Sequence, residues 1–178
     1  MTAQIEDTFL FRGEEYSLIG MTDGSLVDPL EYNMEPEMIH TACYRGFYAT
    51  YELTDEALFL RKLTINDKND YYPPIGGVEP KNSGCEAVYT GLNVVIDFTG
   101  KIRLAKDFIE ELYIHMGFQK PSAFKTVLDI TLENGRPVEI NDRSEEIEQM
   151  RGEFKKHYGS RGIEERIDEA FRFDMELE

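Results

Sequence analysis

The sequence predicts an α+β fold: mainly antiparallel β-hairpins or a β-meander, with one or two amphipathic helices at the C-terminal end. Apolar and polar residues alternate along several segments, which is typical of half-buried strands. Asn134-Gly135 separates two of these segments and favours a two-residue type I′ turn. After Asn141 the apolar spacing becomes helical. We therefore expect a single domain over residues 1–178, β-rich over 1–141 and helical over 142–175.

Two hairpins are predicted in the first third of the chain. Residues 9–11 and 16–19 are short apolar segments on either side of Gly13, which supplies the positive φ of a tight turn. Residues 46–54 alternate strictly, and residues 57–65 form the return strand of the second hairpin.

Irregular structure is expected in two places. Residues 28–39 contain two prolines and several acidic residues, and residues 66–84 are rich in Asn, Asp, Pro and Gly. Within residues 107–116, Phe108, Glu111, Leu112 and His115 fall at helical spacing, so a short helix there is an open alternative to a strand.

Four further strands are expected before the helical part of the chain. Residues 91–99 alternate cleanly, and after a turn at Thr99-Gly100 the same period continues over 101–108. Residues 126–133 and 136–140 flank the Asn134-Gly135 turn and predict a hairpin.

The C-terminal part has the pattern of two amphipathic helices. Asp142 and Glu145 have the spacing of a capping box, and Ile147, Met150 and Phe154 follow on one helical face. Gly159 interrupts this pattern. A second apolar stripe then follows, formed by Ile163, Ile167, Ala170 and Phe171. We expect both stripes to face the protein core.

Charge is the strongest constraint on the possible partners. The chain carries 35 acidic and 19 basic residues, a formal net charge of −16. Residues 1–60 contain twelve of the acidic residues and only two basic ones, Arg12 and Arg45. Such a surface repels nucleic acid and anionic membranes and attracts basic proteins. We expect a basic protein surface as the partner and neither nucleic acid nor membrane, with mimicry of DNA phosphates as an alternative.

The sequence predicts a cytoplasmic protein. No apolar run approaches the ~20 residues of a membrane span, and Glu6-Asp7 stands where a signal peptide has basic residues. Cys43 and Cys85, the two cysteines, lack CxxC spacing and are typical of thiols in a reducing compartment. Whether they lie close enough for a disulfide is left open.

The N-terminal third resembles a family of uncharacterised bacterial proteins. The matching segments are FLFRGEEYSL at 9–18, PLEY at 29–32, TACYRGFYATYEL at 41–53 and LFL at 58–60. Family members often have Trp at the positions of Tyr44 and Tyr51, whereas this chain contains no Trp. The resemblance implies a shared fold and a bacterial origin. This part of the chain is also similar to the small proteins found near toxin–immunity and contact-competition systems. The resemblance implies no site residues.

Catalytic and metal-binding patterns are weak. Cys85, His115 and Asp129 follow the chain order of some cysteine hydrolases, but no helix start accompanies Cys85 and the adjacent Glu86 disfavours a thiolate. His40 and Cys43 lack a second ligand pair at matching spacing. We therefore expect no metal site and no cofactor. A pair of carboxylates for glycoside cleavage depends on spacing in three dimensions, which the sequence does not give.

Arg45 allows two interpretations. Its guanidinium could stack on the neighbouring aromatic residues and anchor a partner. Alternatively, it could form a structural ion pair with Glu52 or Glu56. Tyr71, which precedes Pro73-Pro74, allows a similar choice between a contact residue and a tyrosine packed at a sheet edge.

The leading hypothesis is a non-catalytic, acidic protein-binding domain, in its most concrete form an immunity-like inhibitor of a basic partner. The residues predicted to bind the partner are Glu14, Glu15, Glu31, Glu35, Glu37, Tyr44, Arg45, Tyr48, Asp55, Glu56 and Tyr71. Two alternatives are kept: a cysteine-dependent hydrolase and a small-ligand-binding protein with an apolar cavity between the sheet and the helices.

Overall fold

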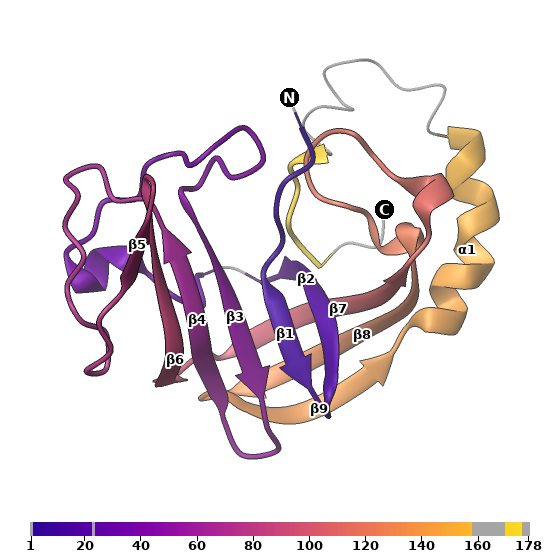
Figure 1. The fold of residues 1–178 in the computed structure, drawn as a ribbon. Coiled ribbons are helices and arrows are strands. Elements are labelled where there is room, and N and C mark those ends of the chain that lie inside the picture. The colour runs from indigo at the N-terminus through magenta and orange to yellow at the C-terminus, as the bar shows by residue number, and fades with distance from the viewer. Residues whose placement is uncertain (1, 23, 158–169, 176–178) are drawn as a thin grey trace.

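The computed structural model describes residues 2–22, 24–157 and 170–175. Among these residues, nine strands form one sheet in the order β5-β6-β4-β3-β1-β2-β7-β8-β9 (Figure 1). Their bounds are β1 Thr8–Phe11, β2 Glu14–Met21, β3 Phe47–Leu53, β4 Leu58–Ile65, β5 Lys81–Ser83, β6 Glu86–Ile96, β7 Gly100–Phe108, β8 Phe124–Glu133 and β9 Arg136–Asp142. A helix, α1 (Ser144–His157), follows β9. The described chain is thus mostly β with a helix near its C-terminal end.

The sheet is mixed, because one of its strand pairs is parallel. β1 pairs with β3 in parallel, while its pairing with β2 and all other strand pairings of the sheet are antiparallel. A parallel pair needs a long connection. Residues 22–46 supply part of it, because they link the end of β2 to the start of β3 on the other side of β1.

The sheet curves back on itself. β6 and β7 are separated by four strands in the sheet order, yet only residues 97–99 connect them along the chain. Such a short connection requires the two arms of the sheet to face each other, as Figure 1 shows. The predicted turn at Thr99-Gly100 therefore passes from one arm to the other and does not close a hairpin.

The inner faces of the two arms enclose the main core. Its fully buried side chains come from both arms and include Phe9, Tyr51, Leu60, Tyr89, Leu104 and Ile130. Burial of each such side chain contributes roughly 1.5–3 kcal/mol. The hydrophobic effect on the inner faces therefore holds the curved sheet closed.

A second, smaller core lies on the outer face, between α1 and the β7–β8 arm. It contains Ile147 from α1 and Val127 from β8, both fully buried. The predicted first helix is therefore confirmed, beginning at Ser144. Asp142 Oδ1 accepts a hydrogen bond from Ser144 N at 2.9 Å, as a residue at a helix start does.

One end of the curved sheet is closed by the β8–β9 turn. Asn134 and Gly135 have φ of 50° and 75°, which confirms the predicted type I′ turn. Gly135 N donates to Phe98 O at 2.8 Å, so the turn docks on the connection between the two arms. A Cβ at Gly135 would lie 2.3 Å from Ile96 O, which only glycine avoids.

β6 begins at Glu86, five residues earlier than predicted. Ala87 and Tyr89 are fully buried, and so is Leu92, although alternation from Ala87 would turn position 92 outward. Gly91, with φ of 74°, lies where the pairing of β6 with β4 shifts register. This bulge inverts the alternation, so the pattern after Gly91 cannot be extended backwards.

Two helical predictions remain. Residues 107–116 do not form an α-helix: β7 extends to Phe108 and a single 3₁₀ turn follows at Glu110–Leu112. Phe108 pairs with Phe124 of β8, and the backbone bonds from Leu112 N to Ile109 O and from Tyr113 N to Glu110 O belong to that 3₁₀ turn. The second amphipathic stripe, over 163–171, falls mostly on residues 158–169, which lie outside the described residues.

Candidate functional site

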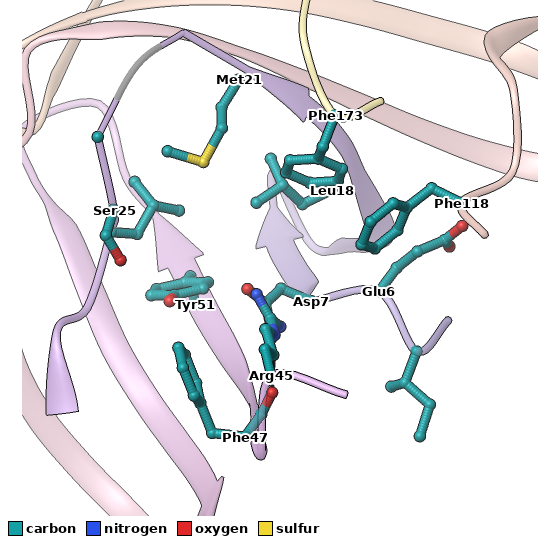
Figure 2. Close-up of a pocket in the computed structure, with 13 residues that line it drawn as sticks. Glu6, Asp7, Leu18, Met21, Ser25, Arg45, Phe47, Tyr51, Phe118 and Phe173 are labelled. Carbon is teal, nitrogen blue, oxygen red and sulfur yellow. Dashed lines mark hydrogen bonds and ion pairs between the residues drawn. The ribbon is translucent and has the colours of Figure 1, made fainter. Parts of the chain in front are cut away.

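A cavity of about 300 Å³ lies at the end of the sheet where β1 and β3 begin (Figure 2). Most of its wall is apolar, with a few charged and polar groups. The lining residues come from five parts of the chain: Ile5, Glu6, Asp7, Leu18, Met21, Gly24, Ser25, Leu26, Arg45, Phe47, Tyr51, Phe118 and Phe173. Its volume is at the lower end of the ~300–1,000 Å³ that small-molecule sites occupy.

Backbone hydrogen bonds between distant segments build the rim of this cavity. Ile5 N donates to Ala42 O at 2.8 Å, and Gln4 N donates to Gly117 O at 2.7 Å. The N-terminal segment therefore lies between two loops. Phe118 N donates to Ala170 O at 2.8 Å, which ties the C-terminal segment to the same rim.

Asp7 is the buried charge at the centre of the site. Its side chain is only 4% exposed. Oδ1 accepts a hydrogen bond from Ala49 N at 2.7 Å in β3 and another from Arg45 Nη2. The described residues provide no hydrogen bond to Oδ2. One carboxylate oxygen therefore fixes the start of β1 to β3, and the other stays available.

Arg45 lies at the mouth of the cavity. It combines features of both interpretations of the sequence, an ion pair and a stack on an aromatic ring. It forms an ion pair, but with Asp7 and not with Glu52 or Glu56. Glu52 instead accepts from Arg61 Nε at 2.6 Å. The Arg45 guanidinium also stacks 4.7 Å from the centroid of the Phe47 ring, and its Nε donates to Phe47 O at 2.7 Å.

Burial perturbs the ionisable groups of the cavity. It raises the pKa of the Asp7 carboxyl, while the charge and hydrogen bond of Arg45 and the Ala49 N–H act in the opposite direction. Burial raises the pKa of the Tyr51 phenol well above its ordinary value, and the nearby Asp7 charge adds to this. Burial also raises the pKa of Glu6, which a bond to Ser17 and the Gln119 N–H oppose.

Tyr51 and the aromatic walls give the cavity its character. Tyr51 is 1% exposed, and its hydroxyl makes no hydrogen bond within the described residues. Figure 2 shows Tyr51 and Phe47 on one side of the Asp7–Arg45 pair and Phe118 and Phe173 on the other. The rings of Phe118 and Phe173 lie 4.8 Å apart between centroids. The site can therefore hold a small apolar body next to unsatisfied polar oxygens.

The predicted partner-binding acids fall into two groups at opposite ends of the sheet. Phe11 pairs with Glu14 and with Leu53, so the β1–β2 and β3–β4 turns lie together. Glu14 and Glu15 begin β2 beside the first turn, and Asp55 and Glu56 lie in the second. Glu37 N instead donates to Asn66 O at 2.9 Å, near the start of β3. Seven residues of strand, roughly 20 Å, separate the two ends.

The remaining predicted contact residues are dispersed. Glu14 pairs with Lys106, and Glu35 with Lys68 at 3.4 Å, so part of the acidity is neutralised locally. Of the predicted contact tyrosines, Tyr44 and Tyr71 are exposed, at 45% and 51%. Neither lines the cavity, and nor does the half-buried Tyr48; of the predicted contact residues only Arg45 does.

The candidate cysteine hydrolase residues are not joined by any hydrogen bond in the described structure. Cys85 is exposed in the turn between β5 and β6, at one edge of the sheet. His115 packs against Tyr113, with ring centroids 4.8 Å apart. Asp129, in β8, binds Arg103 through both carboxylate oxygens at 2.7 and 2.8 Å. Asp129 therefore has a structural partner in place of an imidazole.

The described residues contain neither a cluster of metal ligands nor a helix that could span a membrane. His40 Nδ1 accepts a hydrogen bond from Ala42 N at 3.2 Å, which uses it in a local turn with Cys43. Within the described ranges, no group of three or more His, Cys, Asp or Glu residues is arranged to hold a metal ion. Over the same ranges, no helix combines the length and apolar content required to cross a bilayer.

Comparison with known proteins adds no relative. A scan of protein-family models and searches of curated proteins and of solved structures found no match to the chain. The resemblance of the N-terminal third to a bacterial family therefore stays a prediction. Evidence for function therefore comes from the cavity and the surface.

Proposed function

We propose that the protein is a non-catalytic binding protein that holds a small, mainly apolar ligand in the cavity. This is the third of the functional classes that the sequence left open. The cavity lies between the two arms of the sheet and the terminal segments, whereas the sequence predicts it between the sheet and the helices. The end of the sheet that contains the cavity, where β1 and β3 begin, is called the open end.

One observation carries this proposal. Two side chains that are at least nine-tenths buried, Asp7 and Tyr51, line the cavity with oxygens that no described residue satisfies. Both side chains line the cavity, so a ligand there can bind these two oxygens. A ligand with an apolar body and a hydrogen-bonding group would use them and cover the apolar wall at the same time.

A pair of tryptophan variants tests the proposal. Met21→Trp fills the cavity, whereas Met38→Trp changes an exposed methionine outside it. The neutral fluorophore N-phenyl-1-naphthylamine should brighten with the wild-type protein and with Met38→Trp, but not with Met21→Trp. Equal brightening with all three proteins would place the fluorophore elsewhere and contradict the proposal. Urea unfolding of each variant separates blocked binding from loss of fold.

A second candidate function is recognition of a basic protein by the acidic turns. The parallel β1–β3 pair supports it, because it brings Glu15, Asp55 and Glu56 to one end of the sheet. Carboxylates that converge in this way would steer a basic partner and speed its association.

Two triple variants test this second candidate. Glu15→Gln, Asp55→Asn and Glu56→Gln remove charge at the turn end. The control, Glu31→Gln, Glu35→Gln and Glu37→Gln, removes the same charge elsewhere. In a pull-down from lysate at low salt, a basic partner should be lost with the first variant and retained with the control. Retention by both, or loss by both, would remove the assignment to this end.

A further inference from the structure

The polar groups of the cavity have an excess of negative charge. Among the lining residues that the structure describes, Glu6 and Asp7 contribute two carboxylates and Arg45 the one cation. The Arg45 charge is already paired with Asp7 and lies at the mouth, where its side chain is 36% exposed. The protein as a whole carries a net charge of −16. An anionic ligand would therefore meet repulsion both at the surface and inside the cavity.

The walls of the cavity have the features of a site for organic cations. Four aromatic rings, those of Phe47, Tyr51, Phe118 and Phe173, line it from both sides. Aromatic faces attract ammonium groups, and cages of such rings recognise quaternary ammonium ligands. Phe47 is already used by Arg45 in this way, with its guanidinium 4.7 Å from the ring centroid. The other three rings have no such cation in the described structure.

The hydrogen-bonding groups fit the same ligand. Asp7 Oδ2 is an acceptor without a donor in the described structure. A protonated amine would donate an N–H to it, in a charge-assisted hydrogen bond. A quaternary ammonium group has no N–H and would be attracted to the carboxylate by its opposite charge. The raised pKa of Tyr51 keeps its phenol neutral, so it adds no charge to compete with this contact.

We infer that the ligand is a small organic cation, an amine or quaternary ammonium compound, whose charged group lies between Asp7 and the rings of Tyr51, Phe118 and Phe173. This rests on the proposed function, because it names the chemical class of the ligand that the cavity holds. Arg45 stays paired with Asp7 Oδ1 at the mouth, and the ligand uses Oδ2.

Three probes of similar shape test the inference: choline, its neutral isostere 3,3-dimethylbutan-1-ol, and the anion 3,3-dimethylbutanoate. Binding is followed by NMR of the protein labelled with ¹³C at its methionine methyl groups. Met21 reports on the cavity and Met38 serves as the internal control. Choline should shift Met21 and leave Met38 unchanged. Its Kd should be at least about tenfold lower than that of the alcohol, and the anion should bind more weakly than either.

Two variants locate the cation. Asp7→Asn keeps Oδ1 for Ala49 and Arg45 but removes the charge, and should reduce the preference for choline over the alcohol to near unity. Phe118→Leu should weaken choline binding ~5-fold or more and leave the alcohol within ~2-fold, since it removes one ring. Phe118→Leu also serves if Asp7→Asn fails to fold. Phe108→Leu, at an exposed ring outside the cavity, should change neither Kd.

The outcomes distinguish failure of the cation assignment from failure of the proposed function. Binding of the alcohol or the anion at Met21 with an affinity equal to or greater than that of choline would overturn the cation assignment and leave the proposed function standing. Shifts at Met38 alone, or no shift of Met21 with any probe together with no fluorophore binding, would overturn both.

Discussion

The two ends of the curved sheet are built by different means. At the closed end, the Asn134-Gly135 turn docks on the β6–β7 connection, and its shape follows from adjacent residues with positive φ. At the open end, the cavity is lined by side chains from five parts of the chain, such as Asp7, Arg45 and Phe173. The closed end is therefore set by local backbone preference and the open end by long-range pairing. Stability should depend most on the first and binding on the second.

The largest expected effect is at the closed end. Gly135→Ala should cost about 2–4 kcal/mol of unfolding free energy, because it adds a Cβ at positive φ against the backbone of Ile96. Gly84→Ala is the matched control, with φ of 66° and nothing near its Cβ, and should cost about 1 kcal/mol. Urea unfolding of both variants gives the comparison. Equal costs would mean that the docking of the β8–β9 turn contributes little.

The second effect is at the open end and depends on pH. Arg45→Gln leaves the Asp7 carboxylate buried without a cation, at a cost of about 1–3 kcal/mol near neutral pH; partial exposure of Arg45 keeps it below the range for a fully buried pair.

The pKa of Asp7 is raised in the folded protein, so the folded form binds more protons than the unfolded form between the two pKa values. Loss of Arg45 raises that pKa further. The cost of Arg45→Gln should therefore shrink as pH falls through the Asp7 pKa, because a neutral carboxyl needs no cation.

Unfolding measured at about pH 7 and about pH 5 checks this pH dependence. Arg61→Gln is the control, because the Arg61–Glu52 pair lies on partly exposed side chains and contributes at most about 1 kcal/mol. A cost of Arg45→Gln that is constant with pH would exclude Asp7 as its cause.

These two ends also show what the sequence could predict. The β8–β9 turn and the start of α1 follow from residues within a few positions of each other, and both were predicted. The cavity depends on contacts such as Asp7 with Ala49, which are 42 residues apart. Asp7 stood among twelve acids of the first 60 residues, and no local pattern distinguished it. Phe118 and Phe173 had no signal either, because their role arises when two loops meet.

The smallest effect is at the helix start, away from both ends. Asp142→Ala should cost about 0.5–1 kcal/mol, since it removes the bond that Oδ1 accepts from Ser144 N. Hydrogen bonds from Ser144 lower the pKa of Asp142. Its contribution is therefore present above the unfolded-state pKa and lost as pH falls through the folded-state pKa. Urea unfolding checks it, with the exposed Glu148→Ala as a control near zero; equal values would mean that this cap is not stabilising.

The most direct test of the account is a crystal structure of the protein soaked with choline. The account predicts the ammonium group in the cavity, next to Asp7 Oδ2 and between the rings of Tyr51 and Phe118. A well-ordered, accessible cavity without ligand at saturating choline, or choline bound only elsewhere, would contradict the assignment of this site.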